Sequence, residues 1–324
     1  MQTLSIIVPC YNEEAVIEEF YNRTIKVVDS LKSQNIEASI LFINDGSKDK
    51  TLYILSQIAL HDKRVKVLNF SRNFGHQPAV TAGLNNCTTD LAVIIDADLQ
   101  DPPELISELV EEQRKEEASV VYCVRKQRKG ETLFKKITAN LFYRTMNRLS
   151  EVEFPRNTGD FRLIDRKAID AFNSLKERGK YIRGLVVWIG FKQVPVYYSR
   201  DARFAGETKY PLKNMLSFAK KAMLYFSTKP LKISIGLGII AFIVGLLYGL
   251  WVWFGHVLGF TAATTGWTST VILIIFFGGI QLLTVGVLGQ YIGVLFDEVK
   301  RRPEYIIDTK LNFDKEQSCI DPDK

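Results

Sequence analysis

Two long uncharged stretches constrain this chain more than any other feature of its sequence. Residues 233–254 and 270–296 contain no Lys, Arg, Asp or Glu, and each is long enough to cross a bilayer. The connection between them, residues 255–269, is short and uncharged. Lysines precede the first stretch, and a basic run at 300–302 follows the second. By the positive-inside rule both ends face the cytoplasm, so we expect a transmembrane hairpin with a small external loop.

A buried helical hairpin in a soluble protein is the alternative interpretation, and it is the weaker one because two successive charge-free stretches are hard to bury. Glycines in the second stretch indicate close helix–helix contact, within the hairpin or between protomers; they are Gly278, Gly279, Gly286, Gly289 and Gly293. We expect an amphipathic juxtamembrane helix at 211–230, two transmembrane helices within 231–298 and a cytoplasmic C-terminal tail at 299–324.

The first 210 residues read as an α/β domain. Segments with helical spacing alternate with apolar runs at 4–10, 39–44, 65–70, 91–95 and 120–124. This order predicts a mostly parallel sheet with helices on both faces. The first run begins almost at Met1, so we expect no signal peptide and a domain on the cytoplasmic side. The four cysteines lack metal-ligand or disulfide spacing, which favours reduced thiols.

The apolar run at 91–95 ends on two alternating carboxylates, Asp96 and Asp98. If the strand geometry persists, a period of two points both side chains the same way, and Mg2+ or Mn2+ removes their repulsion. Gln100 adds an amide oxygen to this metal set. Ligands of open α/β sheets bind beyond the carboxyl ends of the strands, where this pair would lie. A solvated loop is the alternative, and the neighbouring motifs make it less favoured.

Polar residues also follow the first two apolar runs. Tyr11 and Glu13 come after the first run, and Asp45 after the second. A bound nucleotide needs an apolar wall, a ribose acceptor and a base partner, which these side chains can supply. For Asp45 with the following Gly and Ser, the alternative is a turn that caps a helix.

In this order, the motifs resemble the family 2 glycosyltransferases of the GT-A fold. Within that family the chain is similar to polyprenyl-phosphate glycosyltransferases, the group of dolichyl-phosphate mannose synthase and bacterial undecaprenyl-phosphate glucosyltransferases. The motifs that carry the resemblance are PCYNEE, NDGSKDKT, SRNFGHQPAVTAGL, DADLQDPP, GDFRL and RFAGETKYPL. The resemblance spans about residues 4–303 and implies a Rossmann-like nucleotide-sugar-binding domain. It also implies an inverting, metal-dependent hexose transfer to undecaprenyl phosphate at the membrane, for cell envelope polysaccharide.

The resemblance implies roles for individual residues. The catalytic positions are Asp160 and Asp98, and the metal ligands are Asp96, Asp98 and Gln100. The nucleotide-sugar-binding positions are Pro9, Tyr11, Glu13, Asp45, Asp96, Ala97, Arg203 and Lys209. The candidates for the acceptor phosphate are Arg125, Arg128 and Lys136. Lipid headgroup contacts are the alternative for Arg203 and Lys209, and an ordinary surface helix is the alternative for residues 133–149.

Asp160 occupies the family position of a general base that activates hydroxyl acceptors. A phosphate monoester differs, because its second ionisation lies at about pH 6 and its oxygen is already largely deprotonated at neutral pH. We therefore expect Asp160 to orient the acceptor or Arg162 more than it removes a proton. His76, in the loop motif SRNFGHQ, is expected to support the site from behind.

Two other functions compete with this interpretation. A processive polysaccharide synthase is disfavoured, because we find no QxxRW block and only two spans. A non-catalytic scaffold or flippase partner is disfavoured by the intact acidic motifs. UDP-glucose is the favoured donor, while UDP-galactose, GDP-mannose and an aminoarabinose donor stay open. The expected partners are the nucleotide sugar, the polyprenyl phosphate, the membrane and further copies of the chain, with a tetramer possible and no nucleic acid.

Overall fold

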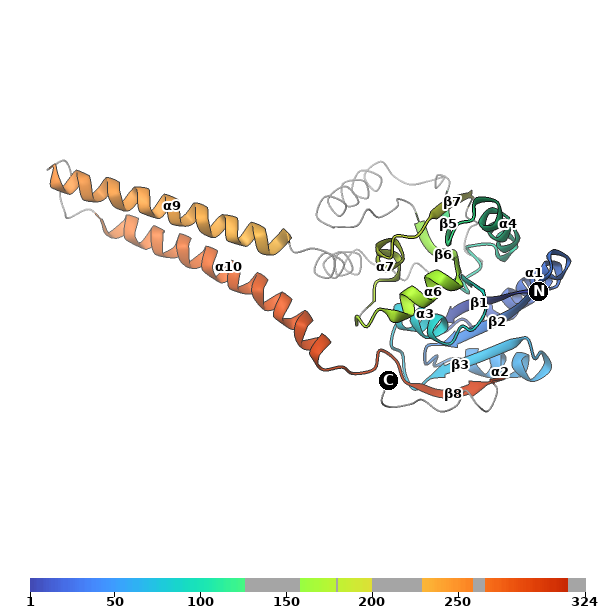
Figure 1. Ribbon diagram of the computed structural model, residues 1–324. Helices are drawn as coiled ribbons and strands as arrows, with labels where there is room; N and C mark the ends of the chain where they lie inside the picture. Colours follow the sequence, from blue (N-terminus) through green and yellow to red (C-terminus); the bar gives the residue numbers. More distant parts are fainter. Residues whose placement is uncertain (126–157, 179, 200–228, 259–265, 314–324) are drawn as a thin grey trace. The chain divides into compact units, whose positions relative to one another are not determined.

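The computed structural model describes residues 1–125, 158–178, 180–199, 229–258 and 266–313 (Figure 1). These residues divide into two compact units. The first contains the described residues up to 199 together with 302–313, and the second contains residues 229–301. Two expected helices fall mainly outside the described residues. The helix at 133–149 lies outside entirely, and of the amphipathic segment at 211–230 only residues 229 and 230 are described.

A single mixed sheet forms the centre of the first unit, and its order across the described strands is β7-β5-β6-β4-β1-β2-β3-β8. The strands are β1 Gln2–Cys10, β2 Ile36–Asn44, β3 Val65–Phe70, β4 Leu91–Ile94, β5 Val120–Arg125, β6 Thr158–Asp165, β7 Gln193–Tyr198 and β8 Ile307–Leu311. Strands β1 to β4 are mutually parallel, β5 and β7 are parallel, and β6 and β8 are antiparallel to their neighbours. The predicted α/β class with a mostly parallel sheet is confirmed.

Helices cover both faces of this sheet (Figure 1). One layer consists of α1 Ile17–Leu31, α2 Thr51–His61 and α4 Ile106–Glu116; the other includes α3 His76–Asn85 and α6 Arg166–Ser174, with α7 Ile182–Trp188 beside α6. Strand β1 shows why two layers form, because alternate side chains point to opposite faces. Ile6 and Val8 join the core that α1 completes, whereas Ile7 packs on α3 at Gly83. A Cβ at Gly83 would lie 2.3 Å from Ile7 Cγ2, so this close approach needs glycine.

The chain returns to this sheet after the second long helix. Strand β8 pairs with β3 and forms the edge of the sheet. Tyr305 stacks on Phe70 with ring centroids 5.2 Å apart, and Asn312 Nδ2 donates to the carbonyl of Val65 at 2.8 Å. These contacts hold the residues just before and just after β8 on the sheet.

The C-terminal assignment at 299–324 is therefore corrected in part. Residues 307–311 are an edge strand of the first unit and not a separate tail. The sequence IDTKL gives no apolar run, because an edge strand needs only one buried face and its backbone partners decide its structure.

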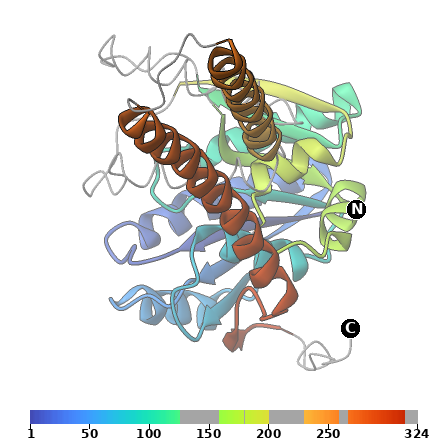
Figure 2. The same cartoon turned by 90° about the vertical axis from the view of Figure 1, so that its left-hand side faces the viewer.

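The second unit is a pair of long helices, α9 Lys229–Val257 and α10 Trp267–Val299 (Figure 2). The two helices contact each other. The segments Leu231–Gly255 and Ile272–Val299 have mean hydropathies of 2.4 and 2.3. In the most apolar part of α9 only 11% of the residues are buried, and in that of α10 none are. The core helix of a soluble protein would be mostly buried. Both helices are long and apolar enough to cross a membrane.

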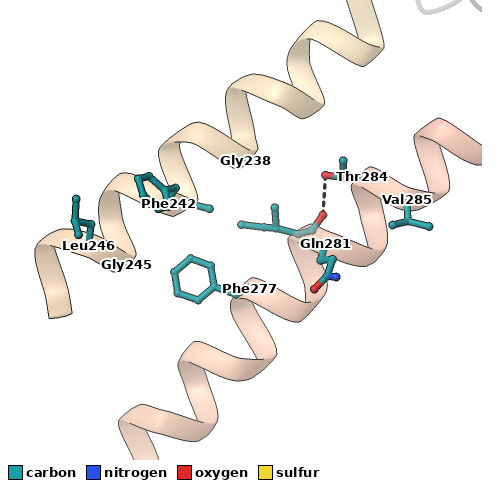
Figure 3. Close-up of a pocket in the computed structure, with 10 residues that line it drawn as sticks. Gly238, Phe242, Gly245, Leu246, Phe277, Gln281, Thr284 and Val285 are labelled. Carbon is teal, nitrogen blue, oxygen red and sulfur yellow. Dashed lines mark hydrogen bonds between the residues drawn. The ribbon is translucent and has the colours of Figure 1, made fainter.

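Gly245 and Phe277 make the close contact of the hairpin. A Cβ at Gly245 would lie 2.8 Å from Phe277 Cζ, so glycine lets the ring pack against the α9 backbone. A groove of ≈ 570 Å³ lies beside this contact, lined by residues such as Phe242, Gln281 and Thr284 (Figure 3). Five glycines are predicted to make helix contacts, namely Gly278, Gly279, Gly286, Gly289 and Gly293. A Cβ added at any of them would meet no described atom within 4 Å outside its own helix backbone and chain neighbours, so α9 does not approach these positions as closely as Phe277 approaches Gly245.

Candidate active site

Two loops at the carboxyl edge of the sheet are tied together by hydrogen bonds. Asn12 Oδ1 accepts from the Lys48 backbone N–H at 2.8 Å, and the Asn12 N–H donates to Ser47 Oγ at 2.9 Å. The Glu13 N–H donates to Thr51 Oγ1 at 2.9 Å. The loops after β1 and β2 therefore form one framework, which sets the backbone positions of Tyr11 and Glu13.

Asp45 anchors a third loop to this framework. Its buried carboxylate accepts the backbone N–H groups of Phe74 at 2.6 Å and Gly75 at 2.9 Å. Burial raises the pKa of Asp45, while these two hydrogen bonds oppose the rise. The next residue, Gly46, has φ +61°, and a Cβ there would lie 2.3 Å from the Arg72 carbonyl carbon. Asp45, predicted to bind the nucleotide, thus also fixes the loop that leads into α3.

The other residues expected at the donor site lie at the same edge. Pro9 is buried within β1, and Ala97 is buried directly after Asp96. Tyr11 and Glu13 are half-buried where β1 ends. Besides burial, the charges of Glu13 and Asp96 raise the pKa of the Cys10 thiol, so both carboxylates lie near the end of β1.

The acidic motif after β4 leaves strand geometry earlier than expected. Strand β4 ends at Ile94, residues after Asp96 form a turn, and Leu99 has φ +56°. The strand does not continue through Asp98, so the expected period-two alignment of Asp96 and Asp98 is wrong. Both side chains are nevertheless half-exposed at the sheet edge, and Asp98 Oδ1 accepts the Gln100 N–H at 3.1 Å.

Asp96 carries an incompletely compensated charge. Burial raises the pKa of Asp96, His76 lowers it, and the nearby carboxylates of Asp160 and Asp98 raise it further. Within the part of the chain that the structure describes, no three His, Cys, Asp or Glu side chains are arranged to hold a metal ion. Asp96 and Asp98 are thus at most a partial ligand set, which a substrate or water would have to complete.

Asp160 lies inside β6 in a different environment, with only 7% of its side chain exposed. Arg183 on α7 binds it through two hydrogen bonds, Nε to Oδ1 at 2.7 Å and Nη2 to Oδ2 at 2.9 Å. Burial alone would raise the pKa of Asp160, but Arg183 and His76 hold it well below its usual range. The carboxylate is ionised and fixed in its plane.

His76, the first residue of α3, lies between the two acidic groups. Its Nε2 is 3.2 Å from Asp160 Oδ2 and 3.7 Å from Asp96 Oδ1. Burial lowers the pKa of His76, but the two carboxylates raise it to about 9, so the imidazole is protonated at neutral pH. The supporting role expected for His76 thus acquires two named partners.

Arg125, predicted to bind the acceptor phosphate, belongs to a buried cluster at the end of β5. Its Nε donates to Tyr198 Oη at 3.2 Å, and its Nη2 lies 3.6 Å from Asp101 Oδ2. The Tyr198 hydroxyl in turn donates to Asp101 Oδ1. A Cβ at Gly159 would lie 2.7 Å from Arg125 Nη2, so the guanidinium passes directly over β6 next to Asp160. The cluster joins β5 and β7 to the loop after β4.

Four predicted site residues lie outside the described residues: Arg128, Lys136, Arg203 and Lys209. Three residues of the site were not expected from the sequence, namely Arg183, Asp101 and Tyr198. The available signal was indirect: a carboxylate in a buried strand needs a cation, because isolated buried charge is costly. Nothing in the sequence spacing says that this cation is Arg183, twenty-three positions later.

Comparison with known proteins gives consistent results over nearly the whole chain. The profile of glycosyl transferase family 2 matches residues 5–172. The uncharacterized glycosyltransferase YkcC of Bacillus subtilis is 51% identical over 94% of this chain and 92% of its own length. A prophage bactoprenol glucosyl transferase homolog of Escherichia coli is 40% identical over 94% and 98%. The bactoprenol glucosyl transferase of Shigella phage SfII is 38% identical over 94% and 97%.

Proposed function

Because the chain belongs to glycosyl transferase family 2 and is a glycosyltransferase, we propose that it moves a hexose from a nucleotide diphosphate sugar to a polyprenyl phosphate. Two relatives are named as bactoprenol glucosyl transferases, which indicates glucose as the sugar and bactoprenol as the lipid. The proposed reaction therefore uses UDP-glucose and undecaprenyl phosphate, with inversion at the anomeric carbon.

One observation carries this proposal beyond the family. A half-exposed pair of carboxylates, Asp96 and Asp98, lies at the carboxyl edge of the sheet near the buried Asp160. The same chain contains two helices long enough to span a bilayer. Acidic groups at this edge suit a nucleotide diphosphate with a cation, and the helices suit an acceptor that never leaves the membrane.

The residues after β4 fit a divalent cation. Their donors are all oxygen atoms, from Asp96, Asp98 and the amide of Gln100, which suits Mg2+ or Mn2+. Mg2+ is commonly held by one or two carboxylates together with substrate phosphates and water, so an incomplete protein ligand set is the expected one. The raised pKa of Asp96 supports this fit, since negative charge there is not fully compensated. When bound, the cation would neutralise charge on the departing nucleoside diphosphate.

The remaining donor contacts follow from the framework of the loops. We propose that Tyr11 and Glu13 contact the nucleoside beside Asp45, and that Pro9 and Ala97 shape the backbone around it. Arg203 and Lys209 are proposed to bind the diphosphate, where guanidinium and ammonium groups match phosphate oxygens. The acceptor phosphate is assigned to Arg125, Arg128 and Lys136.

Asp160 is proposed to act as a fixed anion and not as a proton acceptor. Its low pKa makes it a weak base, and the acceptor phosphate needs no base because it is already ionised near neutral pH. The carboxylate instead orients the groups around the attacking oxygen, so that the phosphate oxygen reaches the anomeric carbon opposite the departing diphosphate. Arg183 and His76 compensate its charge while the acceptor binds.

Helices α9 and α10 are proposed to anchor the protein in the cytoplasmic membrane, with the catalytic unit and both termini on the cytoplasmic side. The basic residues before α9 and after α10 support this orientation. The five α10 glycines that α9 leaves uncovered support a homo-oligomer, with a tetramer as the proposed size.

A transfer assay with the purified full-length protein in detergent tests the proposal. Undecaprenyl phosphate is supplied with radiolabelled UDP-glucose, UDP-galactose or GDP-mannose, each with Mg2+ or with EDTA. We expect lipid-soluble label from UDP-glucose, and its loss in EDTA. Label from another sugar would change the donor alone. A folded protein that gives no label from any of these sugars would contradict the proposed reaction.

A further inference from the structure

Helix α7 contributes a charged group to the site that neither the motifs nor the relatives' names assign. Arg183 holds both oxygens of Asp160, at 2.7 and 2.9 Å, in the two-pronged arrangement that fixes the plane of a carboxylate. Its side chain is 30% exposed, whereas that of Asp160 is 7% exposed. Arg183 thus lies between the buried aspartate and the solvent-accessible side of the site.

The start of α7 is itself fixed by the neighbouring helix α3. The Ile182 N–H, which has no partner within its own helix, donates to Gln77 Oε1 at 2.9 Å. At the other end, Gln193 Nε2 donates to the Val186 carbonyl at 2.9 Å. The side chains of Ile182, Leu185 and Val186 are buried, so the helix has little freedom to shift.

A closed set of contacts results from two pairs of adjacent residues. On α3, His76 contacts Asp160 while Gln77 caps α7; on α7, Ile182 receives that cap while Arg183 binds Asp160. The contacts of His76 on α3 and of Arg183 on α7 therefore meet on the same carboxylate, and Gln77 links the two helices directly. Such a closed arrangement restricts Asp160 to one orientation, because rotation of its side chain would break three hydrogen bonds at once.

We infer that Arg183 is a positioning residue of the transfer reaction, which acts through Asp160 by fixing the orientation of its carboxylate. This inference rests on the proposed function. A misplacement of about 1 Å in a reacting geometry can cost roughly 100-fold in rate, so loss of Arg183 affects turnover more than substrate affinity. Arg183→Lys keeps the charge but not the two parallel hydrogen bonds, and therefore separates orientation from charge.

A double-mutant cycle tests this inference with the full-length protein in detergent. Transfer from UDP-glucose to undecaprenyl phosphate is measured for wild type, Arg183→Gln, Asp160→Asn and the double variant. We expect Arg183→Gln to lower kcat about 10- to 100-fold with KM for UDP-glucose within about 2-fold. Because Arg183 acts through Asp160, the double variant should lose no more than Asp160→Asn alone, within about 2-fold. Arg183→Lys should recover only part of kcat.

The matched control is Arg166→Gln. Arg166 has a similar exposed fraction, 32%, pairs with Asp170 on α6 and donates to the carbonyls of Cys87 and Thr89. These partners are not site residues, so its loss should leave transfer unchanged. Binding of UDP reports whether each variant retains its fold. Wild-type kcat in Arg183→Gln overturns the inference, and so do fully multiplicative losses in the double variant or loss of UDP binding in both Arg183 variants. A wild-type protein that transfers no sugar overturns the proposed function, and the inference with it.

Discussion

The acidic residues of this site lie in two opposite electrostatic environments, and His76 is placed between them. After β4, Asp96 and Asp98 are half-exposed, and the pKa of Asp96 is raised by burial and by neighbouring carboxylates. Inside β6, Asp160 is buried, and the charges of Arg183 and His76 outweigh its burial, so its pKa is lowered. His76 Nε2 lies 3.2 Å from Asp160 and 3.7 Å from Asp96.

The contrast shows how one residue type can serve two purposes. A carboxylate whose charge is already compensated has little to gain from a cation, whereas a carboxylate whose pKa is raised by neighbouring carboxylates gains more. The fixed guanidinium of Arg183 would therefore keep Asp160 from competing for the proposed cation. All three residues are aspartates, so the surroundings of each side chain determine its proposed task.

The largest expected effect comes from removing a carboxylate of the acidic motif after β4. Asp98→Ala should abolish transfer, a loss of at least about 1,000-fold, together with metal-dependent donor binding. Transfer and Mg2+-dependent UDP binding are measured on the same preparation. Asp90→Ala, directly before β4 at the opposite end of the strand, is the control and should keep full activity. Activity that survives in Asp98→Ala, or in excess EDTA, would refute the metal role.

Removing the charge of Asp160, which Arg183 and His76 compensate, should affect turnover alone. Asp160→Asn keeps the shape but loses the anion, and we expect kcat to fall about 100-fold with UDP affinity nearly unchanged. Steady-state kinetics and UDP titration separate the two quantities. Asp165→Asn, at the other end of β6, is the control because Asn can also cap α6 there. An equal loss of UDP binding in Asp160→Asn would contradict this division.

His76→Gln should remove the positive charge that Asp96 and Asp160 share. Loss of a positive charge beside Asp96 favours a cation there by about 1 kcal/mol, or roughly 5-fold tighter half-saturation by Mg2+. Turnover should fall about 10-fold, because Asp160 loses one of its partners. A Mg2+ titration of the transfer rate measures both effects. If half-saturation moves to higher Mg2+, His76 does not compete with the metal for Asp96.

Tyr198→Phe should have the smallest effect. It tests the hydrogen bond that links Tyr198 on β7 to Asp101 in the loop after β4. The substitution removes the hydroxyl that donates to Asp101 and accepts from Arg125, at a cost of about 2 kcal/mol in stability. The thermal midpoint should fall by a few degrees, while kcat at saturating Mg2+ stays within about 2-fold of wild type. A loss of activity as large as that of Asp160→Asn would instead place the buried cluster in the reaction.

The sequence predicts the parallel strands better than the strands around them. The apolar runs that become β1 to β5 are each buried, so hydrophobicity alone identifies them. Strand β8 was missed because IDTKL owes its structure to pairing with β3. At the site, Asp96, Asp98 and Asp160 are recognisable from their motifs. The opposite pKa shifts of Asp96 and Asp160 depend on neighbours such as Arg183 and His76, which only the three-dimensional structure reveals.

Strand β8 also has a consequence for how the protein is made. Strand β3 is synthesised early, but its partner follows α10 near the end of the chain, so this edge stays unpaired while nearly 240 residues are added. Open strand edges promote aggregation, and a nascent chain exposes them for as long as synthesis lasts. Asn69 Nδ2 reaches Asp308 only once β8 arrives. A copy of the gene truncated directly after the hairpin would thus yield a protein with a permanently open edge, prone to self-association before any catalytic defect is measured.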